Sequence, residues 1–387
     1  MIKMLTACTE EIDEIDDAVN EILTQLDLKN NMAENSVGII SCDPEFVQSG
    51  AAAAISKKLP FDTVGVTTRA GATHGVFSSI MFGISVITSD EVKFSVVRSK
   101  EINSENVDDV ISSAYKEGCG RLPGKAELVL AYPPIIPSIG IYPMVNAIFK
   151  VAGNTPVFGT LACSHFSDHR NSFTLVNGVA ESSSAAMVLM SGGIHPDFFM
   201  VSIPAQNLQQ QYGIITKSEG CNVYTVNDMS FKTYLEKLGF PETNINVDSL
   251  YMIPFMINFG DGNPPIARAL YSINSKGIAV FGDGMPEGKT ISLGSLNYGG
   301  ILQTTGELLS QISAKKNING ILFYSCIVRQ ILLGVKNDDE LKEIIQAAEK
   351  IAPYHICYSG GEICPVKNKD GEFVNHAHNY TLIACVF

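Results

Sequence analysis

Short apolar runs of strand length recur along the whole chain, and segments with helical spacing separate them. Near the C-terminus these runs are GILFYSCIVR (Gly320 to Arg329), YSGGEICP (Tyr358 to Pro365) and HAHNYTLIACVF (His376 to Phe387). An apolar run of about four to eight residues bounded by turn residues is typical of a buried strand. Because helices and strands are interspersed throughout, we expect an α+β fold with mixed, largely antiparallel sheets flanked by helices.

Local signals predict particular elements in the first half of the chain. Thr9 is the expected cap of a helix over 10–28, whose apolar residues lie three or four apart. The run at 36–41 predicts a buried strand, and Pro44 is expected to open a second helix. FTLVNG and AAMVLMSG are expected to form a hairpin around Asn177-Gly178.

The length of the chain predicts two domains. Single hydrophobic cores stop growing at about 250 to 300 residues, and this chain has 387 residues, of which 45% are hydrophobic. The composition turns polar at QNLQQQ, within 204–228. We therefore expect one domain over 1–208 and a second over 209–387.

Charge and cysteine usage narrow the class of partner and the compartment. The net charge is −13 and there is no Lys/Arg-rich run, which argues against nucleic acid and against anionic membrane surfaces as partners. No stretch has the pattern of a signal peptide or of a membrane span. The nine cysteines show no CxxC spacing, so we expect reduced thiols in a cytoplasmic protein.

Polar side chains at the ends of the C-terminal strands form the best candidate site, because loops at the edges of a rigid sheet are where binding sites usually lie. Cys326 follows a strand and begins a helix, with Arg329 one turn later, an arrangement that can stabilise a thiolate. A buried, inert thiol is the alternative. Glu362 follows a Gly-Gly turn and is a candidate charge partner for a ligand.

The histidines give weaker signals. His376 and His378 would share one face of a strand, but no spacing completes a recognised metal set, so we expect no metal centre. His165 and His169 lie four apart and are expected to be surface or loop residues. The common nucleotide, hydrolase and metalloprotease motifs are absent. A nucleophile pair of Cys326 with His378 is conceivable, but nothing in the sequence places the two within hydrogen-bond reach.

The succession of these motifs resembles that of FIST-domain proteins, sensory modules with a FIST N domain followed by a FIST C domain. The resemblance is carried by DTVGVTTRAG and TPVFGTLACSHFSDHRNSFTLVNG in the first half of the chain. In the second half it is carried by YMIPFMIN, ARALYSIN, MPEGKTISLGS, GILFYSCIVR, YSGGEICP and HAHNYTLI, in that order. The positions that match family motifs, and that the resemblance implies as ligand-binding residues, are Arg268, Cys326, Arg329, Glu362, His378, Asn379 and Thr381.

The resemblance implies a cytoplasmic input protein for signal transduction that binds a small ligand, such as an amino acid, without transforming it. Its signal would pass to a separate partner, such as a histidine kinase. Two alternatives stay open. The first is a haem-binding nitric oxide sensor that regulates a histidine kinase, and the second is a Cys-dependent enzyme that uses Cys326. We expect no cofactor unless the haem alternative holds.

Overall fold

The computed structural model describes residues 2–165, 170–240, 250, 252–260 and 264–387. Three stretches of the chain follow one order of elements: a strand, a helix, a strand, a helical crossover, a parallel strand, a hairpin and a last strand. We call these stretches the first, second and third units. They cover residues 2–89, 93–191 and 197–386.

The bounds of the elements are as follows. In the first unit they are β1 (Ile2–Thr9), α1 (Ile15–Leu26), α2 (Leu28–Asn31), β2 (Asn35–Cys42), α3 (Pro44–Gln48), α4 (Ala51–Lys58), β3 (Thr63–Thr67), β4 (Ala70–Thr73), β5 (Val76–Ser78) and β6 (Phe82–Ser89). In the second unit they are β7 (Lys93–Arg98), α5 (Val107–Arg121), β8 (Leu128–Tyr132), α6 (Ile141–Ala152), β9 (Val157–Thr160), β10 (Thr174–Val176), β11 (Val179–Glu181) and β12 (Ala186–Ser191). In the third unit they are β13 (Asp197–Val201), α9 (Tyr298–Ser313), β21 (Ile321–Cys326), α10 (Ile327–Leu333), α11 (Asp339–Ala348), β22 (Tyr354–Ser359), β23 (Glu362–Lys367), β24 (Phe373–His378) and β25 (Leu382–Val386).

The units interlock because each hairpin joins the sheet of a neighbouring unit. Each six-stranded sheet takes four strands from one unit and its last two from another, in the orders β1-β6-β2-β3-β10-β11, β7-β12-β8-β9-β23-β24 and β13-β25-β21-β22-β4-β5. In every sheet the central pair is parallel, and the strands on either side of that pair are antiparallel to it. Each unit gives its hairpin to one neighbour and receives a hairpin from the other, so the three units form one body.

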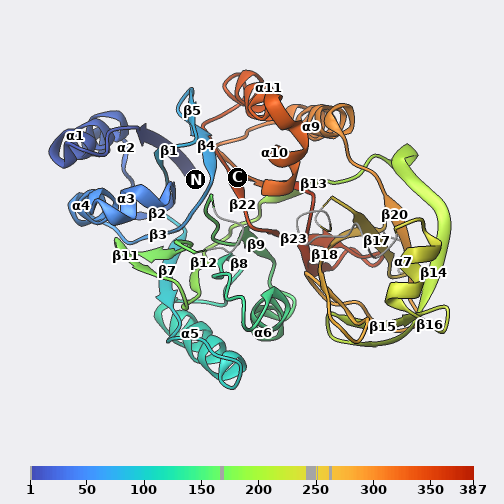
Figure 1. Ribbon diagram of the computed structural model, residues 1–387. Coiled ribbons are helices and arrows are strands. Elements are labelled where there is room, and N and C mark those ends of the chain that lie inside the picture. Colours follow the sequence, from blue (N-terminus) through green and yellow to red (C-terminus); the bar gives the residue numbers. More distant parts are fainter. Residues whose placement is uncertain (1, 166–169, 241–249, 251, 261–263) are drawn as a thin grey trace.

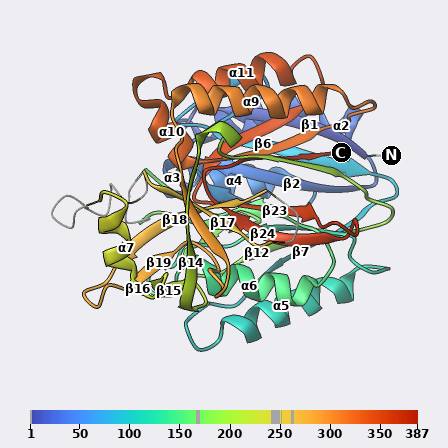
Figure 2. The same cartoon turned by 90° about the vertical axis from the view of Figure 1, so that its right-hand side faces the viewer.

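The hydrophobic core lies where the three sheets face one another. It gathers buried side chains from all three, including Val66, Leu130 and Tyr324. The helices cover the outer faces of the sheets in three groups, as Figure 1 shows at the periphery, and Figure 2 shows α9 and α11 on the opposite side of the sheets from α5 and α6. Because both faces of these sheets are buried, strands such as β6 are buried along their whole length.

A further module is inserted into the third unit, between β13 and α9. It covers residues 208–294 and contains β14 (Leu208–Glu219), β15 (Asn222–Val226), β16 (Met229–Ser230), α7 (Phe231–Lys237), β17 (Pro254–Asn258), β18 (Ile266–Ile273), β19 (Ala279–Phe281) and β20 (Thr290–Gly294). Its strands run in the order β14-β20-β17-β18-β19-β15-β16, and the sheet closes on itself because β14 also pairs with β15. We call residues 208–294 the inserted module and the rest the three-unit body.

The expected α+β class with mixed sheets is confirmed, and several local predictions are confirmed with it. The strand at 36–41 is β2, and Pro44 occupies the first turn of α3. Asn177 and Gly178 have φ angles of 52° and 76° and connect β10 to β11 in a tight hairpin. This conformation is the one that Asn-Gly favours between antiparallel strands.

Two local predictions are wrong. Thr9 does not cap a helix: it ends β1, whose residues pair along their whole length with β6, and α1 begins only at Ile15. AAMVLMSG is not the partner of FTLVNG, since β12 pairs with β7 and β8 instead. In both cases the competing partner is a distant strand, which short-range sequence signals do not report.

The start of the inserted module lies beside the expected domain boundary, since β14 begins at Leu208. Strands from beyond this point nevertheless pair with strands from before it, because β23 pairs with β9 and β22 pairs with β4. In the described ranges, no helix is both long and apolar enough to cross a membrane.

Candidate ligand-binding site

Three of the candidate residues meet where β21 ends and β23 and β25 begin. Glu362 is fully buried, and its Oε2 accepts a hydrogen bond from Thr381 Oγ1 at 2.7 Å. Its other oxygen, Oε1, is buried without a hydrogen-bond partner. Burial raises the pKa of Glu362 well above its usual range, so this carboxyl holds its proton more tightly than an exposed glutamate does.

Cys326 lies beside this carboxyl and is buried. Its backbone N–H donates to Thr381 O at 2.9 Å. Burial, and then the charge of Glu362, raise the pKa of the thiol well above its usual value, and backbone hydrogen bonds from Val328 and Tyr380 and the charge of Arg329 only partly oppose this rise. A cysteine nucleophile acts as the thiolate. The surroundings of Cys326 therefore oppose the chemistry that the enzyme alternative requires.

Arg329 is held by a dense polar network inside the protein. Its Nε and Nη2 donate to Glu340 Oε1 at 2.8 and 2.7 Å, and both side chains are 0% exposed. The glutamate also accepts from three hydroxyls, those of Thr305, Ser325 and Tyr358, at 2.8–2.9 Å. The guanidinium makes further contacts with Ile301 O and Thr304 Oγ1, both at 3.2 Å. This network joins α9, β21, α10, α11 and β22, and its geometry is that of a structural ion pair.

Arg268, on β18, has a different environment. Its side chain is 1% exposed, its Nη1 donates to Ala377 O at 2.9 Å, and its Nη2 lies 3.0 Å from Asp283 Oδ2. Its Nε is buried and has no hydrogen-bond partner. Burial raises the pKa of Asp283, and the charge of Arg268 opposes that rise. Arg268 therefore combines a buried ion pair with one donor that has no hydrogen-bond partner, a feature that calls for an explanation in a native structure.

His378 and Asn379 lie on the strand and turn that support Arg268. His378 is buried, its Nε2 is 2.9 Å from Cys364 O, and its Nδ1 has no partner. Burial lowers the pKa of His378 to about 3, so the imidazole is neutral at physiological pH. Asn379 Oδ1 accepts from the backbone N–H of Ala269 at 3.0 Å, which fixes the turn before β25 against β18.

A cavity of about 300 Å³ lies between the inserted module and the three-unit body, and of the seven positions that match family motifs Arg268 lies on its wall. The inserted module contributes Phe259, Arg268, Gly220 and Asp283 to Pro286, and the body contributes Tyr142, Asn146 and Phe149 from α6 with Asn375 and His376 from β24. The ring of Tyr142 lies between two glycines of the inserted module: a Cβ at Gly220 or at Gly284 would come within 3.1 Å of it. The two parts of the molecule therefore meet closely around this cavity.

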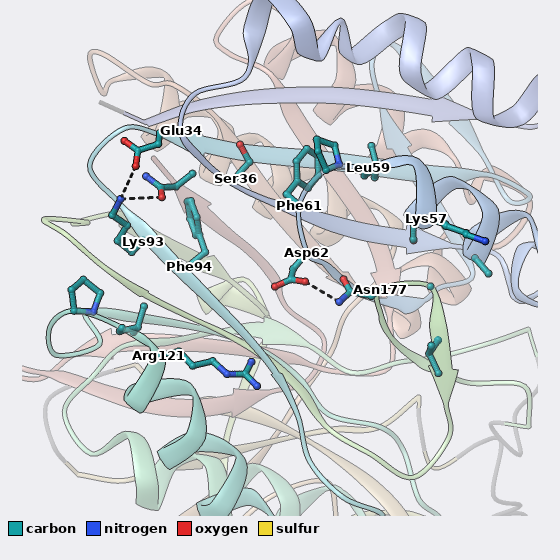
Figure 3. A pocket seen from close by; sticks show the side chains of 18 residues that line it. Glu34, Ser36, Lys57, Leu59, Phe61, Asp62, Lys93, Phe94, Arg121 and Asn177 are labelled. Carbon is teal, nitrogen blue, oxygen red and sulfur yellow. Dashed lines mark hydrogen bonds and ion pairs between the residues drawn. The ribbon is translucent and has the colours of Figure 1, made fainter.

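A larger, open groove of about 1200 Å³ lies between the first and second units. Figure 3 shows the side chains that line it. One pair of its charged side chains forms an ion pair, since Lys93 Nζ is 3.4 Å from Glu34 Oε1, and Asp62 Oδ1 accepts from Asn177 Nδ2 at 2.8 Å. A groove of about 590 Å³ occupies the corresponding place between the first and third units. Since the same depression recurs where neighbouring units meet, the groove follows from the architecture, and we place the candidate site at the Arg268 cavity.

Sequence reasoning missed two acidic partners. Asp283 lies in a Gly-Asp-Gly segment that is typical of a turn, and Glu340 lies in an amphipathic helix with three further acids, Asp338, Asp339 and Glu343, around it. For Glu340 a signal existed, because it is four residues before Ile344 on the apolar stripe of α11.

The histidines predicted as surface or loop residues lie partly outside the described part of the chain. His169 is not among the described residues, while His165 Nε2 is 2.7 Å from Asp43 Oδ2 at a partly exposed position. No group of three or more His, Cys, Asp or Glu in the described part of the chain has the arrangement of a metal site.

These features define an α+β protein in which an inserted module meets a larger body at a small cavity that combines aromatic side chains with a buried ion pair. The chain belongs to the FIST family: the FIST N domain model matches residues 36–229 and the FIST C domain model matches residues 230–365. FIST domains are generally associated with small-ligand sensing in signal transduction. The change from one domain model to the other falls within the inserted module.

Two solved structures are similar over the whole chain, but only loosely. A cyanuric acid hydrolase from A. caulinodans has a TM-score of 0.39 and 6% sequence identity, covering 100% of this chain and 99% of that one. A chorismatase has a TM-score of 0.37 and 8% identity, covering 100% and 98%. Likenesses at this level carry no conclusion about activity. No curated protein matches the chain.

Proposed function

We propose that this protein is a cytoplasmic input module of signal transduction that binds a small zwitterion, such as an amino acid, in the Arg268 cavity. The observation that carries the proposal is the buried guanidinium of Arg268, which has an unpartnered Nε and lies on the wall of a cavity of about 300 Å³. Ligand pockets of roughly this size occur preferentially where domains meet. A guanidinium is well suited to hold a carboxylate.

The acidic partner supports a zwitterion over a simple anion. Asp283 is 3.0 Å from Arg268 on the same wall, so the pair is close to neutral overall. A ligand carboxylate would contact Arg268 and its ammonium group would contact Asp283, leaving no net buried charge. The sequence suggested Glu362 as a charge partner for a ligand, but Glu362 is enclosed by Cys326 and Thr381 and does not line this cavity.

The position of the cavity supports a sensing role. A ligand that touches both the inserted module and the body changes the balance between arrangements of these parts if it prefers one of them. The partner that receives the signal is, in this proposal, a separate protein such as a histidine kinase. The nine cysteines are all free, which supports a reducing, cytoplasmic location.

Haem remains the alternative cofactor. His376 is the one imidazole on the cavity wall, and the aromatic rings of Phe149 and Phe259 line the same space. A porphyrin is much bulkier than an amino acid, and a cavity of about 300 Å³ does not fit it. We therefore favour the small zwitterion and derive nothing from haem.

A thermal-shift screen tests the proposal. The panel contains the standard amino acids, together with carboxylates that lack the amine and amines that lack the carboxylate. A ligand present at about 100 times its Kd should stabilise the protein by about 2.7 kcal/mol. Amino acids should stabilise the wild type, the single-charge analogues should do so far less, and Asp283→Asn should abolish the difference between them.

Asp62→Asn is the matched control, because it removes the same charge from the larger groove and should leave the ligand response unchanged. Absence of stabilisation by every amino acid would count decisively against the proposal. Addition of haemin is a separate arm: a Soret band that His376→Ala removes would replace the zwitterion with the haem alternative.

A further inference from the structure

Aromatic rings line the Arg268 cavity from both parts of the molecule. The three-unit body contributes Tyr142 and Phe149 from α6, and the inserted module contributes Phe259. His376, on β24, adds a fourth ring to the wall. All four residues are partly exposed, so the protein does not wholly enclose their rings. The cavity therefore offers aromatic surface to a molecule that enters it.

The body's two rings lie on one face of α6. Tyr142, Asn146 and Phe149 are four and three residues apart, a spacing that aligns side chains along one face of a helix. Figures 1 and 2 show α6 beside the inserted module. This face of α6 accordingly forms the body's side of the cavity.

Packing within the wall holds the rings in place. The Cζ atom of Arg268 is 6.0 Å from the centroid of the Phe259 ring, and the Phe259 centroid is 5.7 Å from that of the His376 ring. The ring of Tyr142 lies against two glycines of the inserted module. A site whose side chains are already ordered loses little conformational entropy when a ligand fills it.

Apart from Arg268 and Asp283, the described residues that line the cavity include no Asp, Glu, Lys or Arg. A charged ligand side chain would find no counter-ion there, whereas an apolar side chain would be removed from water. An aromatic side chain gains more than an aliphatic one of similar size. The reason is that pairs of rings with centroids about 4.5 to 7 Å apart are stabilised beyond the area that they bury.

We propose that the ligand of the Arg268 cavity is an aromatic amino acid. This inference rests on the proposed function: Arg268 and Asp283 hold the carboxylate and the ammonium group, and Phe149 and Phe259 contact the ligand's ring. Arg268 and Asp283 both belong to the inserted module, so the ligand's charged groups contact that module alone. The aromatic side chain is the part of the ligand that reaches α6, and it therefore couples binding to the arrangement of module and body.

Isothermal titration calorimetry with three amino acids tests the inference. Phenylalanine is compared with leucine and with cyclohexylalanine, whose ring is of similar size but has no π electrons. Contacts with two rings of the wall should make phenylalanine bind about tenfold more tightly than either of the others.

Phe149→Leu and Phe259→Leu each remove one ring from the wall and keep an apolar side chain. Each variant should weaken the binding of phenylalanine by about three- to tenfold and change the Kd for leucine by less than about twofold. Phe94→Leu is the matched control, because Phe94 is also partly exposed but lines the larger groove, where Figure 3 labels it. This variant should bind all three amino acids like the wild type.

The outcomes separate this inference from the proposed function. If no amino acid binds, both are refuted. If leucine or cyclohexylalanine binds as tightly as phenylalanine, the cavity is an amino-acid site without aromatic specificity, and only this inference is overturned. Phenylalanine binding that is unchanged in both wall variants, or that falls only in step with leucine binding, would also overturn it.

Discussion

The ion pair between Arg329 and Glu340 allows a quantitative test of the structure. Arginine does not lose its proton in proteins, whereas a buried glutamate can neutralise itself by taking one up. Glu340→Gln therefore leaves a buried positive charge without a counter-ion. Arg329→Met leaves a carboxyl that can be protonated and that still accepts hydrogen bonds from three hydroxyls. The two single substitutions should consequently differ in cost.

The magnitude follows from burial. Both side chains are 0% exposed, and removing one partner of a buried pair typically costs about 3 to 5 kcal/mol. We expect Glu340→Gln to fall in that range and Arg329→Met to cost less. The double variant Arg329→Met with Glu340→Gln should be less destabilised than Glu340→Gln alone, because it no longer contains the unpaired guanidinium.

Guanidinium denaturation followed by far-UV circular dichroism measures these differences, since the chain has no tryptophan to report unfolding. Lys342→Gln is the control on the same helix: its contact with Asp339 is 3.8 Å long and partly exposed, and it should change stability by less than about 0.5 kcal/mol. A cost below about 1 kcal/mol for Glu340→Gln, or a higher cost for Arg329→Met, would refute the reasoning.

Three further predictions test other parts of the structure. Burial raises the folded-state pKa of Glu362, so the folded state binds a proton more tightly than the unfolded state. The free energy of unfolding of the wild type should therefore fall as pH rises from about 4.5 through the raised pKa. Unfolding curves at several pH values should show a flatter pH dependence for Glu362→Gln. Gly284→Val should force the inserted module away from Tyr142 and lower stability by about 1 to 3 kcal/mol. Adding Tyr142→Ala to Gly284→Val should remove most of that cost. Thermal unfolding of the single and double variants measures the difference. Iodoacetamide at neutral pH should label the partly exposed Cys119 and leave Cys326 unmodified in the native protein, and rapid labelling of Cys326 would restore the enzyme alternative.

The roles of the seven residues implied by the resemblance were harder to predict than the strands that carry them. The structure brings Cys326, Glu362 and Thr381 into one buried cluster and assigns Arg329 to a separate ion pair with Glu340. Of the whole set, only Arg268 lies on the wall of the candidate cavity. Their identity as ligand-binding residues stays a prediction.

The α+β class, the buried strand β2 and the helix opened by Pro44 were available from the sequence alone. Spacings of two and 3.6 residues and local turn chemistry report burial within a few residues of each position, and this information is enough to predict such elements. The same patterns wrongly predicted Thr9 as a helix cap, because the strand that pairs with β1 begins at Phe82, far along the chain.

Only the tertiary structure decided which strands share a sheet and which charges meet. Each hairpin is exchanged into a neighbouring unit, so that β23 pairs with β9 across some 200 residues of chain, and nothing in either segment specifies the other. The pairing of Arg268 with Asp283 arises in the same way, from the folding of β18 against the turn that follows β19. Local sequence determines how much of each segment is buried, whereas packing of the whole chain determines which strand each segment pairs with. Many apolar strands compete for each sheet edge, and only the complete core selects among them.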